Sequence, residues 1–268
     1  MKKEIRIWCP ICGNSSRIIG VVPTIDPKAS EIVDLRRCST CGHWWHSPVP
    51  NQEVLSKLYG QASPFVVSSG AKQKYLTKIT VDAFSGYVLG RVNNLTGNYL
   101  EIGPGGGALL RQFRVMGYNC YGVDPGQWVV DSTIVSNLEN LPNNLRFNVL
   151  VLQDVLEHVY DPVELLSKLR CMLAKHAVVF CSFPCKDSRP ARIRKTAWNM
   201  VRPYGHLHYF SFDSAKKMFS SANLTIEDMH LAEATTITSM LRARQFRSSI
   251  LGLLRGTRDQ IFAQLSCP

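Results

Sequence analysis

The stretch that decides the fold is Tyr99-Leu100-Glu101-Ile102-Gly103-Pro104-Gly105-Gly106-Gly107-Ala108-Leu109-Leu110. It predicts a short buried strand that ends in an acidic residue, then a glycine turn and an amphipathic helix over about 108–116. Because glycine tolerates positive φ, the backbone at Gly103, Gly105 and Gly107 can approach a ligand closely. The first N–H groups of the helix can then bind polar or anionic ligand atoms. A tight turn without a ligand is the alternative.

A second predicted strand, Cys120-Tyr121-Gly122-Val123, ends in Asp124, 17 residues after Gly107. In doubly wound folds, an acid at such a strand end accepts two hydrogen bonds from a ribose diol. The glycine turn and the two acids, Glu101 and Asp124, therefore predict a site for a dinucleotide or for S-adenosylmethionine.

The arrangement resembles motif I of class I S-adenosylmethionine-dependent methyltransferases, and Asp124 resembles their ribose-binding acid. Leu138-Glu139-Asn140-Leu141-Pro142 resembles their adenine-binding loop, although Asn137 stands where an aspartate is usual. Val149-Leu150-Val151-Leu152-Gln153-Asp154-Val155-Leu156-Glu157-His158-Val159 resembles their fourth strand and the turn after it. The resemblance extends roughly from Asn98 to Ile226. It implies that the cofactor is S-adenosylmethionine, bound by Glu101, Gly103, Gly105, Gly107, Asp124, Asn137, Leu138 and Asp154.

Strands and helices alternate in the central part of the chain. The expected strands are 98–102, 119–123, 133–135, 147–152 and 177–183, and the expected helices are 107–116, 127–131, 161–174 and 213–222. This alternation predicts an α/β, Rossmann-like, doubly wound and mainly parallel sheet. A strand is also expected over Thr225–Leu231. No clear final antiparallel hairpin follows, and the remaining chain reads as a basic amphipathic helix with Phe246, Ile250, Leu253 and Leu254 on one face.

The N-terminal residues 1–50 are expected to form a small zinc ribbon. Cys9-Pro10-Ile11-Cys12-Gly13 and Cys38-Ser39-Thr40-Cys41-Gly42 are matching knuckles. Two such turns complete a four-thiolate site that suits zinc and leaves no open position, which predicts a structural metal. A redox-active pair is the alternative. His43 and His46 are expected to pack locally because four thiolates already close the site, and a role as additional ligands is the alternative for them. The predicted ligands are Cys9, Cys12, Cys38 and Cys41.

The rest of the chain divides into a helical connector or lid at 51–92, the Rossmann-like methyltransferase domain at 93–232 and a basic helical segment at 233–268. The aromatic, proline-rich exit of the zinc ribbon, Trp44-Trp45-His46-Ser47-Pro48-Val49-Pro50, is expected to pack on the next domain, and contact with a partner is the alternative. No stretch is long and apolar enough to span a membrane, and the N-terminus lacks the apolar run of a signal peptide. A cytoplasmic location is therefore expected.

The formal net charge of +11 favours an anionic partner. Two clusters concentrate the positive charge, although ordinary solvated faces are the alternative explanation. The first cluster contains Lys186, Arg189, Arg192, Arg194, Lys195 and Arg202, and the second contains Arg242, Arg244, Arg247, Arg255 and Arg258. A nucleotide-linked small molecule or RNA would suit such clusters.

Two histidines are candidates for the catalytic base, because an alcohol acceptor must lose its proton. His158 follows the fourth strand, and His206 lies in a segment that ends in His206-Leu207-His208-Tyr209-Phe210-Ser211. That segment resembles the "HL-x-YFS" run of zinc-bearing sugar methyltransferases. In similar deoxysugar C-methyltransferases a catalytic His-Glu pair precedes it, whereas Tyr204 and Gly205 stand here, so O-methylation fits better. His206 is the expected base and His158 the second choice, with a structural hydrogen bond to the backbone as the alternative for each.

The predicted function is methyl transfer to a small hydroxylated acceptor, such as a sugar, that is anionic or nucleotide-linked. An RNA methyltransferase is the alternative, although Gln153-Asp154-Val155-Leu156 differs from the Asn/Asp-Pro-Pro-aromatic run that grips base amines. An NAD-dependent oxidoreductase is formally permitted by Gly103-x-Gly105-x-x-Ala108, and a non-catalytic binding module also remains open.

Overall fold

The computed structural model describes residues 3–24, 31–51, 53–55, 83–92, 96–126, 131–232 and 259–267. Several sequence predictions therefore lie outside the described residues. These are most of the 51–92 connector, the helix at 127–131 apart from residue 131, and the basic segment that contains Phe246 and the second arginine cluster.

A seven-stranded sheet with the order β12-β13-β10-β9-β6-β7-β8 forms the centre of the protein. Its first five strands in the chain are β6 (Asn98–Ile102), β7 (Asn119–Val123), β8 (Ile134–Val135), β9 (Phe147–Gln153) and β10 (Leu173–Pro184). These five strands run parallel to their neighbours within that group. The predicted Rossmann-like, mainly parallel sheet is thus confirmed.

The C-terminal part of the sheet corrects the sequence prediction. β12 (Thr225–Leu231) pairs antiparallel with β13 (Gln260–Ser266), and β13 also pairs antiparallel with β10. A final antiparallel hairpin is therefore present, and the helical expectation for 233–268 is wrong over 260–266. β13 forms because it pairs with β10 and β12, which lie far from it in the chain. Its seven residues show no local sequence pattern that predicts a strand.

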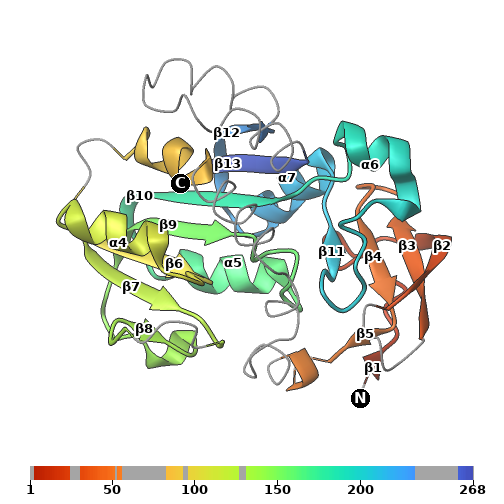
Figure 1. Cartoon of the computed structure of the whole chain (residues 1–268), viewed down its shortest axis with the longest axis horizontal. Coiled ribbons are helices and arrows are strands. Elements are labelled where there is room, and N and C mark those ends of the chain that lie inside the picture. The colour runs from red at the N-terminus through yellow and green to blue at the C-terminus, as the bar shows by residue number, and fades with distance from the viewer. Residues whose placement is uncertain are drawn as a thin grey trace.

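Helices cover both faces of this sheet (Figure 1). The helices with named bounds are α4 (Ala108–Val115), α5 (Pro162–Arg170) and α7 (Phe212–Ser221), and residues 83–89 are also helical.

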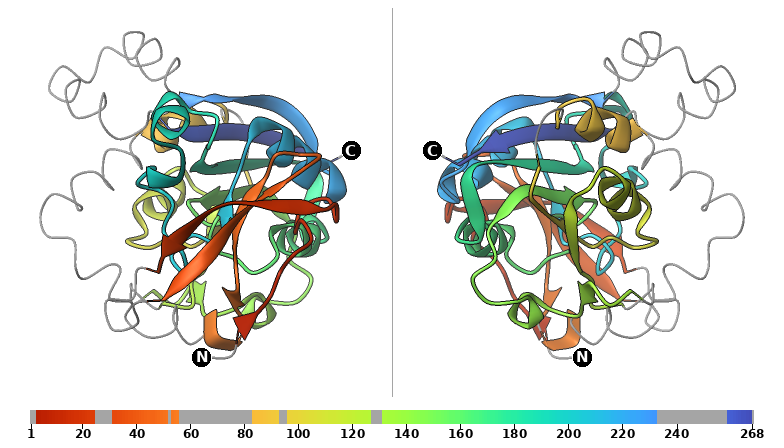
Figure 2. Two further views of the ribbon diagram at one scale, coloured as in Figure 1. Left: turned by 90° about the vertical axis from the view of Figure 1, so that its right-hand side faces the viewer. Right: turned by 90° about the vertical axis from the view of Figure 1, so that its left-hand side faces the viewer.

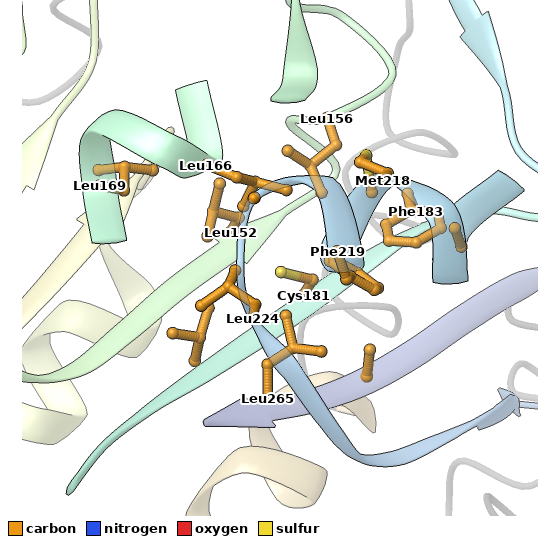
Figure 3. Packing of buried hydrophobic residues seen from close by; sticks show 14 of the residues in the cluster. Leu152, Leu156, Leu166, Leu169, Cys181, Phe183, Met218, Phe219, Leu224 and Leu265 are labelled. Carbon is orange, nitrogen blue, oxygen red and sulfur yellow. The ribbon is translucent and has the colours of Figure 1, made fainter. Parts of the chain in front are cut away.

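Apolar side chains fill the space between the sheet and these helices on both faces. On one face, Leu152 and Cys181 of the strands pack with Leu166 of α5 and Phe219 of α7 (Figure 3). On the other face, Val151 belongs to a second cluster with Phe84 of the 83–89 helix, Phe113 of α4, and Phe180 and Phe262 of neighbouring strands. The adjacent residues Val151 and Leu152 of β9 thus pack on opposite faces of the sheet, as expected when helices cover both faces.

The N-terminal module is a four-stranded sheet with the order β11-β4-β3-β2. Its strands are β2 (Ser16–Pro23), β3 (Ile32–Cys38), β4 (Trp44–Ser47) and β11 (His208–Tyr209), and a separate short pair joins β1 (Lys3–Glu4) to β5 (Val49–Pro50). β11 comes from the later part of the chain, and Trp198 and Tyr204 share a buried cluster with Val33 and Leu35. The module therefore does not end at residue 50, because residues around α6 (Arg189–Arg194) and η2 (Lys195–Ala197) complete its core.

The module lies beyond the carboxyl ends of the parallel strands. The arrows of β7 and β9 point toward it in Figure 1, and Figure 2 (left) shows its sheet in front of the central one. Trp45 is fully buried, belongs to the same apolar cluster as Leu156, and donates from Nε1 to the carbonyl of Arg6 at 3.0 Å. The expected packing of this aromatic exit on the next domain is confirmed at Trp45. The edge of the sheet where ligands bind in such folds thus faces the module.

Candidate functional site

The glycine turn has the backbone shape that the sequence predicted. Gly103 and Gly105 have φ values of 67° and 50°, and Gly107 has 66°. A Cβ at Gly103 would lie 3.0 Å from Val155 Cγ2, whereas a Cβ at Gly105 would meet nothing within 4 Å. The space above Gly105 is therefore open to a ligand. α4 begins directly after the turn, and its N-cap, Gly107, makes no side-chain cap hydrogen bond.

Asp124, at the end of β7, is tied to the same turn. Its Oδ2 accepts a hydrogen bond from the Gly105 N–H at 3.1 Å, and its Oδ1 accepts one from the Gly126 N–H at 2.8 Å. A carboxylate offers about four lone-pair sites, so this one can still accept from a pair of hydroxyls. The structure thus brings the predicted ribose-binding acid to the glycine turn.

Glu101 is buried beneath the turn. Its Oε2 accepts a hydrogen bond from the Tyr99 hydroxyl at 2.9 Å, and the backbone of Leu110 at the start of α4 also donates to the carboxyl. Burial raises the pKa of Glu101 to about 7 and outweighs these two bonds, which lower it. Near neutral pH the protonated and the ionised forms of Glu101 are therefore both populated.

The other predicted cofactor residues occupy the same edge of the sheet. Asn137 caps η1 (Leu138–Asn140), accepting from the Asn140 N–H at 3.1 Å, and Leu138 packs half-buried against the core. Asp154 follows β9 with a φ of 51°, and its Oδ1 accepts from Gln260 Nε2 at 2.7 Å. Burial, and then Asp259, raise the pKa of Asp154 to about 7. Sequence reasoning missed Gln260, and no local signal could have found it, because it reaches Asp154 only through β13.

The two candidate bases meet edge to face. The rings of His158 and His206 have centroids 4.7 Å apart and an angle of 82° between their planes. Nδ1 of His158 lies 2.6 Å from the Gly205 carbonyl, and Nδ1 of His206 lies 2.9 Å from the Met200 carbonyl. Since a carbonyl only accepts, each Nδ1 carries the proton and each Nε2 is the unprotonated nitrogen. The backbone hydrogen bonds that the sequence analysis gave as the alternative are present, and they leave Nε2 in the form that a base needs.

The charge state of the pair follows from burial. Burial lowers the pKa of His158 to about 4, and burial followed by the repulsion of His158 lowers the pKa of His206 well below its ordinary value. Both imidazoles are therefore neutral at pH 7. A neutral imidazole can accept a proton, although a lowered pKa makes it a weaker base.

Glu157 joins the two segments that carry these histidines. Its backbone carbonyl accepts from the N–H groups of Leu207 at 2.7 Å and His208 at 3.2 Å. Its carboxyl is buried, with Oε1 3.7 Å from His158 Nε2, and burial raises the pKa of Glu157 well above its ordinary value. Sequence reasoning did not select Glu157, although it lies directly before His158 in the quoted fourth-strand run.

Residues inside and just before the HL-x-YFS segment contact the N-terminal module. The Tyr204 hydroxyl donates to Glu31 at 3.0 Å, and its ring belongs to the module core. Nδ1 of His208 lies 3.1 Å from Nε2 of the fully buried His43. His46, also fully buried, lies with its Nε2 3.4 Å from the Tyr204 N–H. The expected local packing of His43 and His46 is confirmed.

The members of the first basic cluster differ in their surroundings. Arg202 lies close enough to His158 and His206 to lower the pKa of both, and its Nε donates to the Asn199 carbonyl at 2.7 Å. Lys186 pairs with Asp187 at 2.8 Å. The remaining members, Arg189, Arg192, Arg194 and Lys195, are exposed on α6 and η2.

The four predicted metal ligands gather at one point of the module. Sγ of Cys9 lies 3.6 Å from Sγ of Cys41, and Sγ of Cys12 lies 3.5 Å from those of Cys38 and Cys41. Tetrahedral zinc with bonds of about 2.3 Å separates its sulfurs by about 3.8 Å. The N–H groups of Ile11, Thr40 and Cys41 point at these sulfurs at 3.3–3.4 Å. The cluster therefore has the shape and second-sphere contacts of a four-thiolate metal site.

Comparison with known proteins identifies the class. Residues 73–228 match the family model described as a methyltransferase domain. The match covers more than half of the chain, and the chain therefore belongs to this methyltransferase domain family. None of the curated proteins matches the sequence.

Solved structures show the same fold. Magnesium protoporphyrin IX methyltransferase from Synechocystis PCC 6803, with bound SAH, is 12% identical with a TM-score of 0.54, over 81% of this chain and 100% of that one. The plantazolicin methyltransferase BpumL, in complex with SAH, is 13% identical with a TM-score of 0.53, over 80% and 93% of the two chains.

The protein is thus a methyltransferase that shares the fold of these two SAH-bound enzymes, and the oxidoreductase alternative is set aside. Within the described ranges, no helix has both the length and the apolar character that crossing a membrane requires.

Proposed function

We propose that the protein transfers a methyl group from S-adenosylmethionine to the hydroxyl oxygen of a small acceptor, such as a sugar or a related metabolite. The observation that carries this proposal is the pair of neutral histidines whose Nδ1 protons are held by the carbonyls of Gly205 and Met200. His158 follows β9, at the carboxyl edge of the sheet where the glycine turn follows β6, and His206 precedes β11.

The open turn fits the cofactor. When bound, S-adenosylmethionine supplies an electrophilic methyl group on a sulfonium. The Asp124 carboxylate would accept from the ribose hydroxyls, and the clear space above Gly105 would admit the ligand against the backbone. Asn137 and Leu138 would lie along the adenine. Ionised Glu101, buried in β6, and ionised Asp154, half-buried directly after β9, would face the cationic part of the ligand.

The histidines would act on the acceptor. We assign His206 as the base, with His158 as the second choice. As the methyl carbon passes from the sulfonium sulfur, which leaves as a thioether, to the acceptor oxygen, the hydroxyl proton would pass to Nε2 of the histidine, whose Nδ1–H stays bound to a carbonyl. Positioning of the acceptor supplies most of the acceleration of such a displacement, and a base adds about 10²–10⁴ in rate.

An anionic or nucleotide-linked acceptor suits the charge beside this pair. Arg202 lies next to both histidines, and its guanidinium matches the oxygens of a phosphate. The half-buried position of Arg202 would strengthen this contact. The exposed arginines of α6 instead support the alternative acceptor, RNA, whose backbone such residues bind in a salt-dependent way.

The metal of the cysteine cluster is proposed to be zinc with a structural role. Four thiolates complete a tetrahedral shell and leave no open position for chemistry. The module is small and shares its core with residues 191–209, so metal binding would contribute folding free energy on the order of 10 kcal/mol.

Radiolabelled methyl donor tests the acceptor class. The protein is incubated with labelled S-adenosylmethionine and with separated extract fractions containing small molecules, polysaccharide or RNA. The proposal expects label in the small-molecule fraction, in a bond that resists alkaline hydrolysis as an ether does. Ribonuclease-sensitive label would favour the RNA alternative, and alkali-labile label would indicate a carboxyl acceptor instead of a hydroxyl.

A further inference from the structure

Three metal-ligating side chains converge outside the cysteine cluster. A carboxylate oxygen of Glu157 and one ring nitrogen each of His158 and His206 lie within 4.8 Å of one another. They come from the loop after β9 and from the segment before β11, which the Glu157 carbonyl joins. Tertiary contacts therefore bring His206 to Glu157 and His158, from which it is far apart in the sequence.

The histidines are oriented as metal ligands usually are. A ligating histidine typically gives its other N–H to a carbonyl, which fixes the ring and leaves the second nitrogen for the metal. Both rings have this arrangement, with Nδ1 at the carbonyls of Gly205 and Met200. In each ring Nε2 is consequently the nitrogen that can ligate. For His158 it is also the atom that lies 3.7 Å from Glu157 Oε1.

The carboxyl of Glu157 supplies the second, independent observation. Its residue is 1% exposed, and among the residues that the structure describes its Oε2 has no hydrogen-bond partner. Burial of a carboxyl without compensating partners is costly. A cation bound between the carboxylate and the two rings would supply the missing interaction. The charge of that cation would also favour the ionised form of a group that burial otherwise drives toward protonation.

We propose that Glu157, His158 and His206 form a second metal site, which binds one divalent transition-metal ion through Nε2 of each histidine and the Glu157 carboxylate. Two imidazoles and one carboxylate suit ions such as Co²⁺, Fe²⁺ or Zn²⁺ better than Mg²⁺ or Ca²⁺. With bonds of about 2.0–2.2 Å, ligand atoms on one ion lie about 3.0–3.5 Å apart, so the most distant pair of these atoms would have to approach by up to about 1.5 Å. Three protein ligands leave positions open for a further oxygen ligand.

The site goes beyond the proposed function and can be tested without turnover. Because the same Nε2 atoms are assigned to proton transfer, His206 can act as the base only in the metal-free form; in the metal-bound form the ion would activate the hydroxyl instead. The ion would then bind the hydroxyl or phosphate oxygens of the acceptor at its open positions. Arg202 beside the histidines disfavours a bare cation but favours one that carries an anionic ligand.

Cobalt titration tests the site directly. Zinc is first loaded to one equivalent so that the cysteine cluster is filled, and Co²⁺ is then added while the visible spectrum is recorded. We expect one Co²⁺ per chain, with weak d–d bands and no near-ultraviolet thiolate charge-transfer band. Glu157→Gln and His206→Asn should weaken binding by at least about 10-fold. His176→Asn is the matched control, because His176 is exposed and its φ of 61° suits asparagine.

Folding of the variants is checked by their thermal midpoint and by S-adenosylmethionine affinity. A measurement on the wild-type protein needs no variant: bound Co²⁺ should shift the ring signals of His158 and His206 in NMR spectra, and leave those of His176 unchanged. The site is overturned if zinc-loaded protein binds no Co²⁺ at concentrations up to about 1 mM. It is also overturned if both variants bind as tightly as wild type, or if the cysteine charge-transfer band carries the whole signal. Label transfer to the acceptor is unaffected by these outcomes and tests the proposed function separately.

Discussion

The imidazoles of His158 and His206 lie edge to face, 4.7 Å apart, although one follows β9 and the other precedes β11. The Glu157 carbonyl holds the two segments together through the N–H groups of Leu207 and His208. This contact places the two candidate bases at the junction between the central sheet and the N-terminal module. The first prediction therefore concerns both histidines and is tested with a variant of each.

His206→Asn should lower turnover by about 10²–10⁴ while S-adenosylmethionine affinity stays within a few-fold. The pKa of His158 is about 4 and that of His206 is well below its ordinary value, so neither ring gains a proton in the pH range near 6.5 where an ordinary histidine does. Turnover should therefore show no loss from protonation of the base in that range. Steady-state kinetics across pH check both statements. Full turnover in both His206→Asn and His158→Asn would show that no histidine base is needed.

Asp124→Ala should weaken S-adenosylmethionine binding by roughly 10- to 150-fold, because charge-assisted hydrogen bonds worth about 1.5–3 kcal/mol are lost. The same change frees the N–H groups of Gly105 and Gly126, so the turn also loses its anchor. Titration calorimetry measures the change. Asp213→Ala, at an exposed position in the first turn of α7, is the control and should bind as wild type does. Equal affinities for the two variants would refute the assignment of Asp124.

Cofactor affinity should depend on pH through Glu101. Burial raises the pKa of Glu101 to about 7, so the carboxyl is protonated below pH 7 and ionised above it. A cationic ligand prefers the ionised form; its affinity should therefore fall as pH drops below 7, by up to about tenfold per pH unit, and level off above 7. Calorimetry between pH 5.5 and 8.5 measures this. Glu101→Gln should flatten the profile, and a flat profile in the wild type would contradict the expected role.

Cys38→Ser should remove one zinc per chain and unfold the module. Elemental analysis is expected to give one zinc for this cluster in the wild type and none there in the variant. Because Asp124 and the glycine turn lie in the central sheet, S-adenosylmethionine binding should persist. Turnover should fall, since the histidine segment leads directly into β11 of the module. The exposed Cys171→Ser is the control, and retention of zinc in Cys38→Ser would argue for other ligands.

The structure also explains which elements were predictable. The strand that ends at Glu101, the glycine turn and α4 depend on interactions between near neighbours, such as positive φ at Gly105 and apolar residues at helical spacing. The strand ending before Asp124 was equally visible. β13 was not, because its seven residues become a strand only between β10 and β12. The same holds for β11, two residues long, which depends on β4.

The sequence by itself determined the glycine turn, its two acids, the paired cysteine knuckles and the alternating pattern of a parallel sheet. Each of these is a local requirement of backbone conformation, ligand geometry or periodicity. Only the tertiary structure decided that Gln260 bonds to Asp154, that residues 189–209 complete the module, and that Glu157, His158 and His206 converge. These contacts join segments far apart in the chain, and their stability comes from shared burial and backbone hydrogen bonds that no short window of sequence contains.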